Sequence, residues 1–128
     1  LSHIGDHAAF VAKLAQLLRP GGALILATQN RPVLERHNTV APTQTGHLRR
    51  WFDRRELEAL LGAHFTIEEM RTMTPMANKG VMRLVAGRRA RRAMRVLSGR
   101  TIERALAGAG FGWTLMALAR KPLTSRTP

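Results

Sequence analysis

The chain has 128 residues, which is the size of one small domain. Hydrophobic residues make up 45% of it, enough for a core, and no apolar run reaches the roughly 18 residues that a membrane-spanning helix needs. Without cysteine the sequence excludes disulfides, thiolate metal sites and a cysteine nucleophile, as we expect of a cytoplasmic protein. The formal net charge of +13 favours polyanionic partners, either nucleic acid or an anionic membrane surface.

The first predicted unit is a helix followed by a strand. Asp6 is a suitable N-cap, and the next apolar residues share one helix face: Phe10, Leu14, Leu17 and Leu18. Arg19-Pro20-Gly21-Gly22 ends the helix and allows the chain to reverse. Residues 23–27 are a continuous apolar run, which predicts a strand buried on both faces, as in a parallel sheet.

A second helix begins after a polar segment, 29–47, that its two prolines predict to be loop. Asp53 and Glu56 have the spacing of a capping box, and Phe52 can pack onto Leu57 across the helix start. The buried stripe of this helix is formed by leucines, and a glycine ends it: Leu57, Leu60, Leu61 and Gly62.

The remaining chain predicts two strands separated by a basic segment. A strand runs from residue 65 to about 70, residues 72–80 form a loop, and the last strand covers 112–119. Between Arg88 and Arg104 there are seven arginines and one glutamate. The apolar side chains of this segment fall on one helix face, opposite the arginines: Ala90, Ala93, Met94 and Leu97. A shorter helix continues over 101–107.

The element order is α, β, loop, α, β, basic helical insertion, β, which predicts an α/β fold. We expect one domain over 1–121, with the insertion at about 86–108 and a frayed tail over 122–128. A sheet of only these three strands exposes an apolar edge. Either a segment that precedes Leu1 or a partner is expected to cover that edge.

Several motifs resemble class I S-adenosylmethionine-dependent methyltransferases. The segment from Leu1 to Asp6 is similar to the one after their fourth strand, and Leu17–Gly22 with the following apolar run is similar to their Arg-Pro-Gly-Gly turn and fifth strand. Thr28-Gln29-Asn30-Arg31, and Gly46-His47 followed by residues 51–57, resemble the ubiquinone-pathway O-methyltransferases of the methyltransferase type 11 group. The resemblance covers most of 1–71 and 111–121 but not 81–110.

The resemblance implies the C-terminal part of a Rossmann-like class I methyltransferase sheet: its last three strands with flanking helices, the final strand antiparallel. The family binds S-adenosylmethionine with a glycine-rich loop after its first strand and an acidic residue at the end of its second. The sequence contains neither, since Gly108-Ala109-Gly110 precedes a strand. The cofactor is therefore expected to be bound mainly by residues missing from this chain, with Ser2 and His3 at the edge of its site and the chain inactive alone.

The resemblance also suggests residues on the acceptor side. His3 could act as general base on an acceptor hydroxyl, because histidine changes charge near neutral pH, or it could only line the cleft wall. Ser2 replaces a carboxylate that a metal ion would favour, so no metal site is expected. Asn30 and Arg31 could bind the acceptor at the end of a strand, or cap the turn and face solvent. His47 could face the same pocket.

The leading hypothesis is a methyltransferase acting on a small-molecule acceptor, by O-methylation of a hydroxylated or quinone-like compound. The basic segment would then be a lid over the acceptor, or an element that lies on an anionic membrane surface. In the second case the protein would be cytoplasmic and peripheral to the membrane. The alternatives are a nucleic-acid methyltransferase, a non-catalytic basic binding module, or a solvated arginine face. Against nucleic acid, no aromatic residue falls between Arg88 and Arg104. The sequence leaves a homodimer open.

Overall fold

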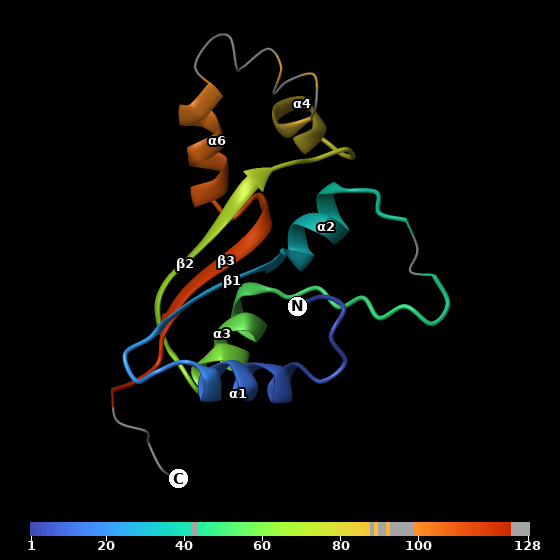
Figure 1. Cartoon of the computed structure of the whole chain (residues 1–128). Coiled ribbons are helices and arrows are strands. Elements are labelled where there is room, and N and C mark those ends of the chain that lie inside the picture. Colours follow the sequence, from blue (N-terminus) through green and yellow to red (C-terminus); the bar gives the residue numbers. More distant parts are fainter. Residues whose placement is uncertain (42–43, 88, 90–91, 93–98, 124–128) are drawn as a thin grey trace.

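The computed structural model describes residues 1–41, 44–87, 89, 92 and 99–123 (Figure 1). These residues form one sheet and several helices. In chain order the elements are α1 (His7–Leu17), β1 (Ala23–Gln29), α2 (Arg31–His37), α3 (Arg54–Gly62), β2 (Thr66–Pro75), α4 (Met82–Ala86), α6 (Gly99–Gly108) and β3 (Gly112–Arg120).

The sheet has three strands in the order β1-β3-β2, and β3 pairs antiparallel with both neighbours. Ala117 of β3, for example, lies opposite Leu26 on one side and Met70 on the other. The mixed α/β composition and the antiparallel final strand are confirmed. The described residues show one parallel pairing, an isolated bridge between Asn30, just after β1, and Phe52. A parallel neighbour of β1 outside these three strands stays a prediction.

The core lies between one face of the sheet and the pair of helices α1 and α3, which Figure 1 shows together on that side. The contacts come from alternate strand residues, because successive side chains in a strand point to opposite faces. The fully or nearly fully buried members are Val11, Ala15, Leu26, Phe52, Leu57, Leu61, Phe65, Met70, Leu115, Ala117 and Ala119. The opposite face of β1 is open, and Ile25 is 70% exposed. The prediction that β1 is buried on both faces was therefore wrong.

The buried stripe of α1 differs from the predicted one. Val11 and Ala15 are buried, whereas Leu17 is 72% exposed. Phe10, Leu14 and Leu18 pack against the core only in part. Val11 and Ala15 belong to the same core cluster as Leu57 and Leu61 of α3, so the buried face of α1 follows from tertiary packing that spacing alone did not reveal.

The turn between α1 and β1 is built as predicted. Gly21 has a φ of 74°, in the left-handed region that favours glycine. A side chain at Gly22 would place its Cβ 2.8 Å from the Arg19 carbonyl oxygen. The Gly21 amide donates to the Lys121 carbonyl, and the Lys121 amide donates to the Gly22 carbonyl, each at 2.9 Å, so the turn is tied to the end of β3.

The capping box at the start of α3 is also confirmed. The Glu56 amide donates to the Asp53 carboxylate, and the Asp53 amide donates back to Glu56 Oε2, both at 2.9 Å. The Arg31 guanidinium pairs with both carboxylates. The Glu56 amide, and after it Arg31, hold the pKa of the Asp53 carboxyl below its usual value. This cluster fixes the entry of α3 next to the end of β1.

Two segments predicted as loop are partly regular. In the first, α2 spans Arg31–His37, because Pro32 lies in the first helical turn, where its missing N–H is not needed. In the second, β2 continues to Pro75, with Arg71 opposite Met116 and Thr72 opposite Leu115. This long-range pairing with β3 overrides the weak local strand signal after residue 70.

The predicted insertion is seen only in part. The short helix α4 precedes it, and α6 at Gly99–Gly108 agrees with the helix predicted over 101–107. The proposed apolar face of Ala90, Ala93, Met94 and Leu97 lies outside the described residues, and so does the tail from 124 onward. Of the arginines of this segment, Arg89, Arg92 and Arg104 are exposed.

We predict that Asp53→Ala lowers the free energy of unfolding more than Asp6→Ala does. Asp6 caps α1 by a single bond from the Ala9 amide, whereas Asp53 has a reciprocal capping box and Arg31. The expected loss is about 1–2 kcal/mol at Asp53 and about 0.5–1 kcal/mol at Asp6, measured by urea unfolding.

The Asp53 contribution should also depend on pH. Because its pKa is lowered on folding, the stabilisation is present above the unfolded pKa of about 3.9 and is lost as pH falls through the folded pKa. The gap between the wild type and Asp53→Ala should therefore narrow in acid. Equal losses for both caps, or a gap that does not change with pH, would contradict the role of this cluster.

Candidate functional site

The described residues form an open pocket of about 250 Å³ at the carboxyl end of β1. Open α/β sheets place ligands outside the carboxyl ends of their strands. The lining combines several polar side chains with one aromatic ring and comprises Leu1, Ser2, His3, Ala27, Thr28, Gln29, Trp113 and Thr114. The structure thus brings Ser2 and His3, both expected from the sequence, to the end of a strand.

The N-terminal segment is attached to this end of β1 through Ser2. Ser2 is 4% exposed, its hydroxyl donates to Gln29 Oε1, and its oxygen lies 3.4 Å from the Thr28 hydroxyl oxygen. Its carbonyl accepts from the Arg50 amide at 2.9 Å. The Phe52 amide in turn donates to the Gln29 carbonyl at 3.3 Å. Ser2 therefore has a structural role in holding the pocket wall.

The geometry of His3 selects one tautomer. His3 Nδ1 lies 2.8 Å from the Leu48 carbonyl oxygen. A carbonyl can only accept, so Nδ1 is the donor and carries the ring proton. In the neutral ring Nε2 then has a free lone pair, and the side chain is exposed to the pocket. An imidazole oriented in this way can accept a proton from a hydroxyl group bound in the pocket.

Asn30 and Arg31 do not line this pocket. The Asn30 amide nitrogen donates to the Gly110 carbonyl at 3.1 Å and to the Gly112 carbonyl at 2.8 Å, and the residue is 6% exposed. Both of its donors therefore join the end of β1 to the start of β3. Arg31 pairs with the acidic side chains at the start of α3, and these contacts raise its pKa above the ordinary value. Their acceptor-binding role stays a prediction, and their visible contacts are structural.

His47 is exposed in the loop before α3 and is not among the described residues that line the pocket. Its chain neighbour Leu48 supplies the carbonyl that orients His3. Sequence reasoning did not single out Gln29 or Trp113. Gln29 could have been found, because it ends an apolar run next to Asn30. Trp113 reaches the pocket only through the pairing of Gln29 with Thr114, which depends on the strand order.

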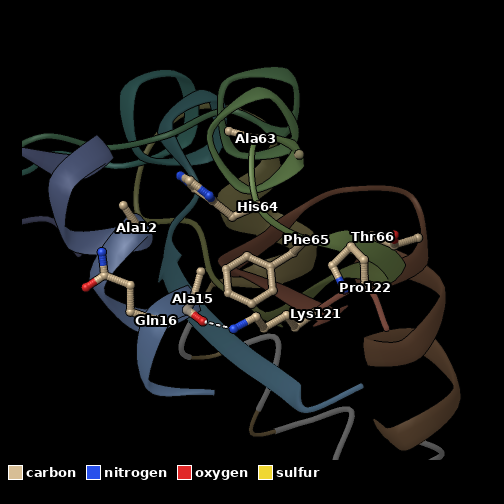
Figure 2. Close-up of a pocket in the computed structure, with 10 residues that line it drawn as sticks. Ala12, Ala15, Gln16, Ala63, His64, Phe65, Thr66, Lys121 and Pro122 are labelled. Atoms are coloured by element: carbon tan, nitrogen blue, oxygen red, sulfur yellow. Dashed lines mark hydrogen bonds between the residues drawn. The ribbon is translucent and has the colours of Figure 1, made fainter. Parts of the chain in front are cut away.

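A larger pocket, of about 520 Å³, lies at the other end of β1, between α1 and the entry into β2 (Figure 2). There the Lys121 ammonium donates to the Ala15 carbonyl at 2.6 Å and to the Leu18 carbonyl at 2.8 Å. A cation is favourable at the C-terminal end of a helix, where carbonyl groups lack partners. Lys121 is thus occupied in capping α1, and this pocket lies at the amino end of β1, away from the usual ligand position.

The described residues do not fit a nucleotide-type cofactor site. The one turn from a strand directly into a helix, between β1 and α2, contains Asn30 with a φ of −85° and no glycine. Glycine at such a turn is what lets the backbone approach a cofactor. The place of Ser2 and His3 at the edge of a cofactor site stays a prediction. Within the described ranges no three His, Asp or Glu side chains gather as a metal site would require.

Comparison with known proteins gives no match, either to a protein-family model or to a curated protein. In the described part of the chain, no helix has both the length and the apolar character needed to cross a membrane.

We predict that Asn30→Asp lowers the free energy of unfolding by about 2–3 kcal/mol at neutral pH. The substitution removes two donated hydrogen bonds and turns a carboxylate toward two carbonyl oxygens. Asn78→Asp is the matched control, because Asn78 is exposed: it loses one long donated bond, to the Thr39 carbonyl at 3.3 Å, and keeps the side-chain oxygen that accepts from the Thr39 amide. The control should stay within about 0.5 kcal/mol of wild type. Urea unfolding measures both, and equal stabilities would contradict the structural role of Asn30.

Proposed function

We propose that this chain forms the acceptor side of a class I S-adenosylmethionine-dependent methyltransferase that methylates a hydroxyl group of a small, hydroxylated or quinone-like compound. One observation carries the proposal: at the carboxyl end of β1, the Leu48 carbonyl holds His3 in the tautomer that leaves Nε2 as a base. The pocket volume of about 250 Å³ lies just below the roughly 300–1,000 Å³ of most ligand sites, which favours a small acceptor.

The sheet topology supports the same family. β1 and β2 run in the same direction, each follows a helix, and the antiparallel β3 lies between them. This arrangement agrees with the three-strand end of a sheet, with its final strand antiparallel, that the motif resemblance implies. The motif resemblance of Leu1–Asp6 and of the Arg19–Gly22 turn adds sequence support from the same region.

On the acceptor side the residues have separable tasks. Trp113 offers an aromatic face for a flat ring, and Gln29 and Thr114 offer polar groups for its substituents. His3 Nε2 accepts the proton of the acceptor hydroxyl, which leaves a more nucleophilic oxygen. S-adenosylmethionine supplies an electrophilic methyl group. Because the described residues do not form its site, we assign no step of methyl transfer to this chain beyond binding, orientation and proton removal.

We predict that His3→Ala lowers turnover at least about tenfold in an enzyme that combines this chain with a glycine-rich, cofactor-binding methyltransferase half. His3→Asn is the matched variant, because its amide can still donate toward the Leu48 carbonyl but cannot act as a base. Both variants should lose the same share of the activity. Recovery of turnover by His3→Asn would show that His3 only positions the wall.

We further predict that the 128-residue chain alone does not bind S-adenosylmethionine in the micromolar range, because no glycine-rich turn follows a described strand. Isothermal titration calorimetry measures this directly. The same chain should bind small hydroxylated aromatic compounds with a change in tryptophan fluorescence that persists in Trp51→Phe, where Trp113 is the one remaining tryptophan. His3→Ala should weaken that binding. Micromolar cofactor binding would contradict the division of tasks, and absence of any acceptor binding would contradict the proposed function.

A further inference from the structure

The helix α4 presents apolar side chains to solvent. Val81, at its N-cap, is 79% exposed, and Leu84 is 73% exposed. Residues three positions apart lie on the same side of a helix, so these side chains project together, with exposed Arg83 between them in sequence. Figure 1 shows α4 at the end of the molecule that also carries α6, away from α1 and α3. We call Val81, Arg83 and Leu84 the α4 surface.

The α4 surface has a fixed position in the fold. The Asn78 and Lys79 amides donate to the His37 carbonyl at 3.0 and 3.1 Å, which ties the start of the segment to the end of α2. At the other end, Ala86 is 2% exposed and its carbonyl accepts from the Ala77 amide at 3.2 Å. The buried side of α4 thus faces the protein through Ala86, and the opposite side is left with two large apolar groups.

The chain segment that contains the α4 surface is strongly basic in sequence. Residues 79–104 contain nine basic side chains and one acidic one, the basic ones being Lys79, Arg83, Arg88, Arg89, Arg91, Arg92, Arg95, Arg100 and Arg104. Four of these arginines are exposed to solvent in the structure: Arg83, Arg89, Arg92 and Arg104. An exposed guanidinium group can pair with an external anion, as Arg31, Arg54, Arg71 and Arg120 pair with carboxylates within the protein.

We infer that the α4 surface and its neighbouring arginines dock this protein onto an anionic lipid membrane. Exposed aliphatic groups beside arginines match the boundary between the acyl chains and the phosphate headgroups of a membrane. The aliphatic side chains insert among the acyl chains, and the guanidinium groups pair with the phosphates. Nucleic acid fits less well, because no aromatic residue between 79 and 104 is available to stack on a base. This inference goes beyond the proposed function and does not depend on it.

The test is sedimentation of the 128-residue chain with vesicles of phosphatidylcholine, with and without phosphatidylglycerol. We expect binding to the mixed vesicles, little to phosphatidylcholine alone, and weaker binding as salt increases. The double variant Val81→Glu and Leu84→Glu should lower the affinity at least about tenfold, because two apolar groups no longer insert. The control is Leu17→Glu, which changes an equally exposed leucine on α1 and should leave binding unchanged.

An RNA gel-shift assay at the same salt concentration distinguishes the alternative macromolecule. Absence of vesicle binding, equal binding to both vesicle types, or equal loss in the Leu17→Glu control would overturn the inference. A combined result would also overturn it: the chain binds RNA, Arg83→Glu abolishes that binding, and the Val81→Glu, Leu84→Glu double variant keeps both RNA binding and vesicle binding. Circular dichroism spectra of all variants verify that these exposed substitutions leave the fold intact.

Discussion

The central position of β3 is the constraint on which the remaining structure depends. The two helix–strand units, α1 with β1 and α3 with β2, do not pair with each other through their strands, and β3 supplies the backbone partners of both. Arg120 illustrates this role, because it lies opposite both Ala23 and Thr66 and its guanidinium bonds to the Glu68 carboxylate and the Gly21 carbonyl. Contacts of such sequence separation close large loops, so the core, the Gly21 turn and the candidate pocket all require β3 in place.

Local signals in the sequence were reliable where a few neighbouring residues determine the structure. The caps at Asp6 and Asp53 and the Pro-Gly-Gly turn are satisfied within a turn or two of chain, and each is found as predicted. The errors arose where distant residues decide. Leu17 is exposed while Val11 and Ala15 are the α1 residues in the core, and β2 extends to Pro75 because β3 is there to pair with it. Pro32 favours a loop in the sequence, but in the structure it lies in the first turn of α2.

The candidate site was predictable to a similar extent. The motif at Leu1–Asp6 pointed to Ser2 and His3, and the structure places both at the end of β1. The sequence could not show that the Leu48 carbonyl orients the His3 ring, since the two residues are 45 positions apart. It also could not show that the Asn30 amide is used for joining β1 to β3, because Gly110 and Gly112 reach it only through the strand order.

The two outer edges of the sheet differ in a way that bears on solubility. Along β2, an irregularity between Ile67 and Glu69 and the charged side chains Glu68, Glu69 and Arg71 discourage the approach of another strand. Along β1 the side chains from Ala23 to Ala27 are apolar, and Ile25 projects into solvent. The backbone pairing of β1 with β3 uses one edge of the strand, and among the described residues the other edge meets only the bridge to Phe52 just beyond its end. Self-association of the free chain would therefore start at β1, and a charged residue in place of Ile25 is the substitution that would oppose it.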